Sequence, residues 1–180
     1  MQKILLIFFI INFNNFSFAS IKENIIINLQ NIDNLSFDFE QNINGKIEKG
    51  NCVIEYPKKI FCNYDNANNK TLVSNGKSLV IKTNSGSYYR YSLERTPLNY
   101  ILDKDFLINE IQNLKEKIID DKFINFKLLK EDNEINIFFN KSNYNLIGWQ
   151  ILDIYQNLSM TYISINFINK KIDDNLFVIP

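Results

Sequence analysis

The sequence of 180 residues contains no histidine, two cysteines, five glycines and three prolines. Without histidine, no imidazole is available to activate a serine or cysteine nucleophile as a general base. Two cysteines alone cannot complete a tetrahedral zinc site. A glycine-rich phosphate loop is also missing, because Ser85-Gly86-Ser87 is too short for one and is typical of a turn. These absences predict a protein that is not an enzyme, holds no metal and needs no cofactor.

An excess of one charge is missing as well. Twenty basic residues balance twenty acidic ones, whereas binding to nucleic acid calls for a basic face. We therefore expect no nucleic-acid partner. Neighbouring carboxylates, such as Asp38 with Glu40 or Asp120 with Asp121, leave open one catalytic alternative, a secreted hydrolase that uses two carboxylates. The first pair falls on the polar face of an expected strand and the second in a turn, and both positions favour solvated side chains.

The first 19 residues have the features of a secretory signal peptide. Lys3 supplies a positive charge, residues 4–11 form an apolar run, and Ser17 and Ala19 are the small residues before a cleavage site. The apolar run is too short for a membrane-spanning helix, and no cysteine near the cleavage site offers a lipid anchor. We therefore expect an exported chain with a single domain, residues 20–180.

Apolar residues dominate the remainder, since 46% of the chain is hydrophobic and 14% is aromatic. Ser20 and Glu23 form a capping box, which predicts that a helix begins there. Ile21, Ile25, Leu29 and Ile32 then give this helix one apolar face over about three turns, up to Asp33-Asn34.

Alternating apolar and polar residues predict strands over most of the domain. Asn75-Gly76 predicts a tight hairpin between two of them. We expect strands at 35–40, 46–56, 60–64, 70–74, 77–83, 87–93, 123–130, 134–140, 146–155 and 159–168, with a short apolar strand within 173–180.

The alternation stops at Thr96-Pro97, where two short helices are expected. Thr96 is a suitable N-cap with Pro97 as the first helical residue, and Asp105 is expected to cap the second helix. The apolar residues expected to face inward are Leu98, Ile101, Leu102, Leu107, Ile108, Ile111 and Leu114. Two short helices between the halves of a sheet favour a cover over the sheet.

The cysteines, Cys52 and Cys62, lie in two expected strands that flank Pro57-Lys58. A turn near Pro57 places them opposite each other, where cross-strand Cβ atoms are about 4.5–5.5 Å apart. An exported protein meets an oxidising compartment, so we expect a disulfide; the alternative is a pair of buried free thiols.

Five segments follow one another in a specific order: LSFDFEQ, GNCVIEYPKKIFCNYD, LVSNGKSLVI, YRYSLERTPLNYIL and LIGWQILDIYQNLSMTYI. Together they resemble the outer-membrane lipoprotein carrier family (LolA), in particular its shorter-loop alphaproteobacterial type. The resemblance implies an α+β fold, an incomplete, unclosed antiparallel β-barrel of about eleven strands. An N-terminal helix and short lid helices would lie over a hydrophobic cavity. One departure is Tyr56, because many family members carry a basic residue there that reaches toward the lid.

The resemblance also implies a function, that of a periplasmic chaperone carrying lipoproteins from the inner to the outer membrane. Its partners would be acylated lipoproteins, an inner-membrane lipoprotein-releasing ABC transporter and an outer-membrane receptor, and we expect a monomer. The alternatives are an envelope lipid- or stress-sensing module of the same fold and the carboxylate hydrolase. For every predicted cavity residue, simple core packing is the competing interpretation. The predicted cavity residues are Leu35, Phe37, Phe39, Ile54, Ile60, Tyr64, Leu79, Ile81, Trp149 and Ile151, and the predicted lid residues are Leu98, Ile101, Leu102, Leu107 and Ile111.

Overall fold

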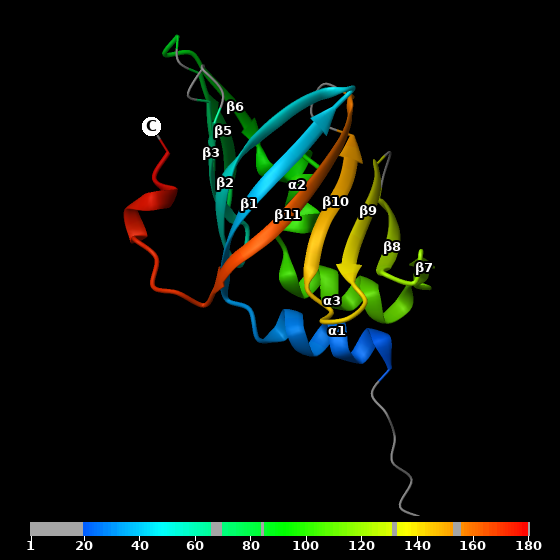
Figure 1. Ribbon diagram of the computed structural model, residues 1–180. Helices are drawn as coiled ribbons and strands as arrows, with labels where there is room; N and C mark the ends of the chain where they lie inside the picture. Colours follow the sequence, from blue (N-terminus) through cyan, green and yellow to red (C-terminus); the bar gives the residue numbers. More distant parts are fainter. Residues whose placement is uncertain (1–19, 66–69, 84, 131–132, 153–155, 180) are drawn as a thin grey trace, which may run out of the picture.

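A computed structural model describes residues 20–65, 70–83, 85–130, 133–152 and 156–179. The predicted signal peptide and cleavage site lie outside these residues. The described strands form one antiparallel sheet of eleven strands in the order β6-β5-β4-β3-β2-β1-β11-β10-β9-β8-β7. The sheet curves strongly around its helices, and β6 and β7 remain as its two ends (Figure 1). The predicted fold, an unclosed antiparallel barrel with few helices, is confirmed.

The strands agree with the alternation pattern over most of the chain. Their bounds are β1 Asn34–Ile43, β2 Lys46–Glu55, β3 Lys59–Tyr64, β4 Thr71–Asn75, β5 Ser78–Lys82, β6 Tyr88–Ser92, β7 Lys117–Ile119, β8 Phe123–Lys130, β9 Asn133–Asn140, β10 Leu146–Leu152 and β11 Leu158–Ile168. The three residues of β7 were not predicted, because so short an edge strand leaves no period to detect. The strand expected over 146–155 ends at Leu152, and residues 153–155 lie outside the described part.

Helix α1, Ile21–Gln30, begins as predicted. The backbone N–H of Glu23 donates to Ser20 Oγ (3.2 Å), and the backbone N–H of Ser20 donates to Glu23 Oε2 (2.6 Å). The helix ends with Asn31 as its C-cap, earlier than the predicted Asp33-Asn34. Ile32 is nevertheless 4% exposed, so the apolar face continues past the last helical turn.

The helices between β6 and β7 begin differently from the prediction. They are the 3₁₀ turn η1 Leu93–Arg95, α2 Leu98–Ile101 and α3 Lys104–Asn113. Thr96 does not cap α2, because its hydroxyl donates instead to the Leu93 carbonyl (2.8 Å) and closes η1. Asp103, and not Asp105, caps α3, since its side chain accepts from the backbone N–H of Phe106 (3.0 Å). Asp103 holds the extended backbone that an N-cap requires.

The C-terminal strand prediction is wrong. Residues Asp174–Phe177 form the 3₁₀ turn η2, which starts where the Asp173 side chain accepts from the backbone N–H of Asn175 (3.0 Å). This local hydrogen bond competes with extended structure. The turn packs against β3 and β4 with Phe177 only 5% exposed, so its apolar residues serve a small satellite contact outside the sheet pairing.

The β2–β3 hairpin confirms the predicted disulfide. Cys52 is paired directly with Cys62 in the register of the two strands, and the two residues are bonded. The turn between the strands contains the cis Tyr56-Pro57 peptide and Lys58 with a positive φ of 67°.

Two glycines allow the sheet to bend tightly. Gly50 is paired with Phe39 across β1 and β2, and a Cβ on Gly50 would overlap both the Asn63 carbonyl and the Phe39 ring. Gly148 lies at a register shift between β9 and β10 with φ 153°, and a Cβ there would overlap the Thr161 carbonyl of β11. The close backbone approach inferred for Gly148 is therefore present, and it sets the position of the neighbouring Trp149.

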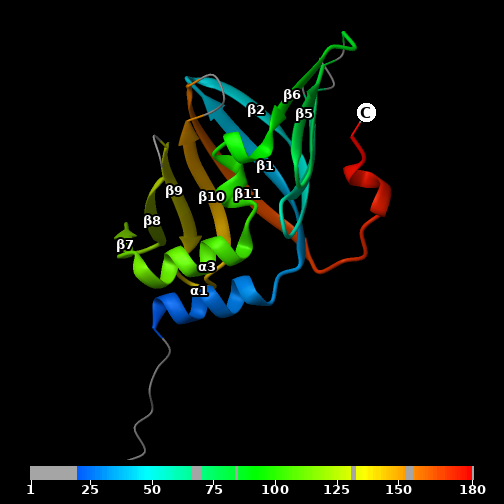
Figure 2. The same cartoon turned by 180° about the vertical axis from the view of Figure 1, so that it is seen from behind.

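Helices α1 and α3 lie side by side at one end of the strands, while α2 lies on the concave side (Figures 1 and 2). This arrangement divides the interior into two parts. The inward residues of β8 and β9, together with α1 and α3, form a solid core. The inward residues of β1 to β5 face α2, and this is where the candidate site lies.

Candidate functional site

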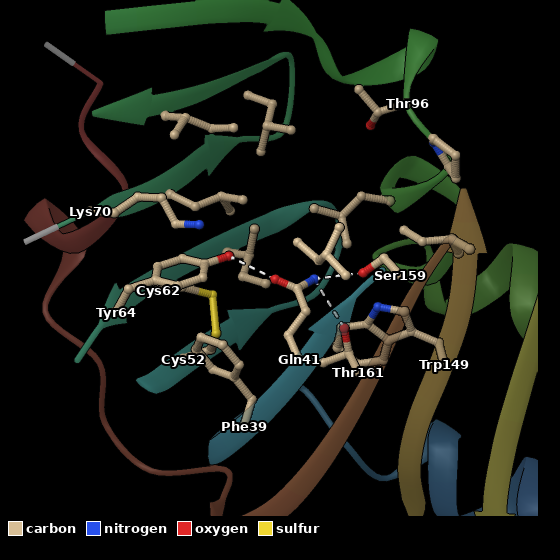
Figure 3. Close-up of a pocket in the computed structure, with 18 of the residues that line it drawn as sticks. Phe39, Gln41, Cys52, Cys62, Tyr64, Lys70, Thr96, Trp149, Ser159 and Thr161 are labelled. Carbon is tan, nitrogen blue, oxygen red and sulfur yellow. Dashed lines mark hydrogen bonds between the residues drawn. A yellow bond between two sulfur atoms is a disulfide. The ribbon is translucent and has the colours of Figure 1, made fainter. Parts of the chain in front are cut away.

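A cavity of about 160 Å³ lies between the concave face of the sheet and the beginning of α2 (Figure 3). Its wall is contributed by β1 to β5 on one side and by β10 and β11 on the other. The lining residues are mainly apolar or aromatic, and none of those described is acidic. They are Phe37, Phe39, Gln41, Ile43, Cys52, Ile60, Cys62, Tyr64, Lys70, Leu72, Leu79, Ile81, Thr96, Pro97, Leu98, Trp149, Ile151, Ser159 and Thr161.

Most residues predicted to face the cavity do lie around it. These are Phe37, Phe39, Ile60, Tyr64, Leu79, Ile81, Trp149 and Ile151. Leu35 and Ile54 do not line it. They are paired with each other across β1 and β2 and are 1% and 0% exposed in the main core, because they lie toward the end of the strands next to α1. The core interpretation therefore holds for these two residues.

The residues predicted to form a lid occupy two environments. Leu98 lines the cavity directly, beside Pro97 and Thr96. Ile101 and Leu102, with Leu107 and Ile111, are 0% exposed and belong to the main hydrophobic core. We call residues 96–114 the lid segment. Only its first part borders the cavity, while α3 closes the core together with α1.

Aromatic rings and the disulfide shape the apolar part of the wall. Phe37 and Trp149 meet edge to face with ring centroids 6.3 Å apart, and Phe39 meets Tyr64 in the same manner at 5.0 Å. Such edge contacts add to the burial of the rings themselves. The disulfide lies in the lining beside Phe39 and Tyr64 (Figure 3). The wall is thus held open by rings and a covalent link that cannot collapse inward freely.

A polar cluster interrupts this apolar wall and was missed in the sequence. Gln41 Nε2 donates to Ser159 Oγ (2.9 Å) and to Thr161 Oγ1 (3.2 Å), and the Tyr64 hydroxyl lies 3.5 Å from Gln41 Oε1 (Figure 3). Ser159 and Thr161 are 0% and 4% exposed. The available signal was the alternation itself. Gln41 follows Phe37 and Phe39 at the same spacing of two and therefore faces inward.

A buried carboxylate with two cations lies beside this cluster. Glu48 is 5% exposed, and it bonds to Lys70 and, at 2.9 Å, to Lys46. Burial alone would raise the pKa of Glu48, but the hydrogen bonds and charges of Lys70 and Lys46 outweigh it and lower that pKa below its ordinary value. Lys70 also lies over the Tyr64 ring, 3.8 Å from its centroid. The Lys70 charge in the cavity wall is therefore already compensated.

The lid segment is fastened to the β2–β3 turn by Lys58. The backbone N–H of Lys58 donates to the Leu102 carbonyl (2.7 Å), and Lys58 Nζ lies 3.3 Å from Asp103 Oδ2. The basic contact absent at Tyr56 is thus supplied two residues later in the sequence. Lys104 adds a second attachment, donating to the Ile32 carbonyl (2.8 Å) after α1.

Two polar atoms near this fastening are buried without a hydrogen bond to any described residue. They are the Tyr56 hydroxyl and Asn99 Oδ1. Burial raises the pKa of Tyr56 well above its ordinary value. A buried polar atom without a partner costs about 1–3 kcal/mol, so the lid segment is held in a closed position that is not fully satisfied.

The site offers burial and little chemistry. Within the described ranges, no group of three or more His, Cys, Asp or Glu side chains could hold a metal. The carboxylate pairs considered for catalysis, Asp38 with Glu40 and Asp120 with Asp121, are exposed and lie away from the cavity. No helix in the described part is long and apolar enough to cross a membrane.

Comparisons with known proteins bear on this site. The family model described as outer membrane lipoprotein carrier protein LolA matches residues 30–180, more than four fifths of the chain. No curated protein matches the chain.

Solved structures show three likenesses at low sequence identity. A LolA superfamily protein of Nitrosomonas europaea is 10% identical, with a TM-score of 0.46 and coverage of 89% of this chain and 98% of that one. A DUF1329 family protein of Desulfovibrio piger is 8% identical (TM-score 0.45, coverage 88% and 95%). A domain of Vibrio parahaemolyticus described as an outer membrane lipoprotein-sorting protein is 9% identical (TM-score 0.46, coverage 85% and 94%). Likenesses at these TM-scores carry no argument of their own, so identification depends on the family match.

Proposed function

The chain belongs to the outer membrane lipoprotein carrier (LolA) family, and from this premise we propose that it is a periplasmic chaperone for lipoproteins. It takes lipoprotein acyl chains into the cavity and carries them from the inner membrane to the outer membrane without chemical change. Cargo arrives from an inner-membrane lipoprotein-releasing ABC transporter and passes to the outer membrane, with or without a receptor, and the carrier acts as a monomer. The alphaproteobacterial type stays a prediction.

The observation that supports this proposal is an apolar cavity inside a curved sheet, bordered by a helical segment. Each CH₂ group of an acyl chain costs about 0.8 kcal/mol in water. The chains of one lipoprotein therefore cost on the order of tens of kcal/mol, which makes unassisted crossing of an aqueous compartment negligible. An apolar cavity offsets this cost for any cargo with the same acyl chains, whatever its protein part.

The cavity must enlarge before it holds such chains. Its volume of about 160 Å³ is below the roughly 300–1,000 Å³ typical of pockets for drug-sized ligands. The first part of the lid segment is the element that can move, because α2 has only four residues. Its closed position depends on Lys58 and leaves the Tyr56 hydroxyl and Asn99 Oδ1 unsatisfied. Opening exposes these two atoms to water, so the closed state resists cargo only weakly.

The free energy of opening also sets the direction of transfer. Part of the binding free energy is spent on opening the lid segment, so the net affinity for acyl chains is lower than their burial alone would give. A membrane or receptor that needs no such opening then takes the cargo in a downhill step. The same property makes the carrier indifferent to the protein part of its cargo.

The direct test is binding of a fluorescent triacylated lipopeptide to the purified chain lacking residues 1–19. We expect saturable binding, no binding of the same peptide without acyl chains, and transfer of intact lipopeptide to vesicles of outer-membrane lipids. Ile81→Glu, which puts a charge in the cavity wall, should lower affinity at least tenfold, while Lys82→Glu on the exposed face of the same strand should not.

Three results would count against the carrier function. Absence of acyl-dependent binding removes it altogether. Binding without transfer favours the sensing module, and cleavage of the lipopeptide favours the hydrolase.

A further inference from the structure

We infer that the cavity also recognises the ester groups of its ligand, through the hydroxyls of Ser159 and Thr161 held by Gln41. This inference rests on the proposed function and adds a ligand class to it: acyl chains attached through ester carbonyls, in preference to hydrocarbon chains of any attachment. The cluster belongs to the cavity wall, yet burial of acyl chains alone gives it no role.

The cluster is expensive to keep in an apolar wall. Buried hydroxyl and amide groups cost free energy unless they are hydrogen-bonded. Gln41 lies on β1, and Thr161 is its direct partner on β11, with Ser159 two residues earlier on that strand. Aliphatic side chains at these three positions would continue the pattern of Phe37 and Phe39 and would enlarge the apolar surface. The polar residues are therefore not explained by holding hydrocarbon.

The donors of the cluster are only partly used. Both bonds between Gln41 and the two hydroxyls run from its amide nitrogen, so Ser159 Oγ and Thr161 Oγ1 act as acceptors. Each hydroxyl keeps its own hydrogen for donation. Among the described residues neither hydroxyl donates to an acceptor, although both line the cavity. Two oriented donors therefore face the space where a ligand would lie.

An ester carbonyl is the acceptor that fits these donors. It accepts hydrogen bonds, donates none and carries no charge. A free anion would call for an unpaired cation, but the nearest one in the wall, Lys70, is already bonded to Glu48. Next to the hydroxyls, Trp149 is paired with Thr161 and Ile151 with Ser159 across β10 and β11. A chain that starts at an ester between the hydroxyls thus continues directly onto apolar wall.

The test compares two synthetic lipopeptides with the same peptide and chain length, one with two ester-linked acyl chains and one with two ether-linked alkyl chains. We expect the unmodified protein to bind the ester form about tenfold more tightly, since two hydrogen bonds are lost with the ether. In the double variant Ser159→Ala and Thr161→Val this preference should fall to within about twofold, with little change for the ether form. Thr161→Ser keeps a hydroxyl and should keep most of the preference.

Ser164→Ala is the matched control, because Ser164 lies on the same strand with its side chain exposed. It should leave both affinities unchanged. Equal binding of ester and ether forms by the unmodified protein would overturn this inference and leave the carrier function intact. Failure to bind either form would overturn both.

Discussion

The two halves of the curved sheet are built from the same alternation but have different interiors. On β8 and β9 the inward residues are fully packed, with Ile124, Phe126, Ile135, Ile137 and Phe139 all 0% exposed. On β1 to β5 the inward residues surround a cavity. The difference comes from the helices. The packed half is covered by α3, ten residues long, which is also joined to β8 by the ion pair of Lys130 with Glu110 (2.9 Å). The hollow half is covered by α2, only four residues long.

Alternation along a strand therefore decides which side chains face inward, but the covering helix decides whether the inside is filled. A short helix that makes few attachments leaves space and can be displaced at low cost. A long helix locked by apolar contacts on both sides cannot. This division of one sheet into a rigid half and an adaptable half is the physical basis of the carrier proposed above.

The largest effect should come from equal truncations in the two halves. Ile137→Ala in the packed half should lower the free energy of unfolding by about 4 kcal/mol, whereas Ile60→Ala in the cavity wall should lower it by about 2 kcal/mol. The reason is that Ile60 already borders empty space and loses fewer contacts. Urea unfolding measures both. Equal losses would mean that the hollow half is packed as tightly as the other.

Removal of the disulfide should have the next largest effect. Cys52 and Cys62 close a short loop with a sequence separation of 10, and their replacement by Ala should cost about 2–3 kcal/mol through the unfolded chain. Because the bond lies in the cavity wall, the double variant should also lose lipopeptide affinity. Reduction of the unmodified protein is the matched measurement. Stability that does not change on reduction would argue against a structural role for the bond.

The Glu48 cluster in the hollow half should show a specific pH dependence. The folded state lowers the pKa of Glu48, so its stabilisation is present above the unfolded value and is lost as pH falls through the folded value. Glu48→Gln should cost about 1–2 kcal/mol at pH 7, and this deficit should shrink as pH falls from about 5 toward 3.

Glu134→Gln is the control for this titration in the packed half. Glu134 is bonded to Lys127 (2.7 Å), but both side chains are about half exposed, so water screens the pair. The pH-dependent difference from the unmodified protein should be clearly smaller than for Glu48→Gln. A deficit of Glu48→Gln that stays constant from pH 7 to pH 3 would contradict the lowered pKa.

Local signals in the sequence were read correctly, and long-range ones were not. The Ser20-Glu23 capping box and the Cys52–Cys62 register involve residues close in sequence, so hydrogen-bonding chemistry and strand geometry sufficed. Gln41 and Thr161 are 120 positions apart and meet only because β1 pairs with β11. No local pattern specifies that pairing, and the polar cluster was therefore missed.

Errors of position had a similar cause. Asp105 was expected to cap α3 because acidic residues near a helix start are common, but Asp103 occupies the extended position before the helix. Leu35 and Ile54 face inward as alternation requires, yet core packing surrounds them near α1. The period of a strand identifies a face of the sheet; it contains no information about which part of that face a helix will fill.

The smallest predicted effect concerns the fastening between the two halves. The Tyr56 hydroxyl is buried without a hydrogen bond to a described residue, so Tyr56→Phe should raise the free energy of unfolding by about 1 kcal/mol. Because opening would give that hydroxyl access to water, the same substitution should favour the closed state and weaken lipopeptide binding about fivefold. Tyr64→Phe is the matched control, since the Tyr64 hydroxyl faces Gln41 Oε1 and its loss should not stabilise the fold. Thermal unfolding and lipopeptide titration of both variants measure these effects. If Tyr56→Phe gains stability without losing affinity, the unsatisfied hydroxyl has no part in opening the cavity; if it loses stability, the hydroxyl is satisfied in the closed state.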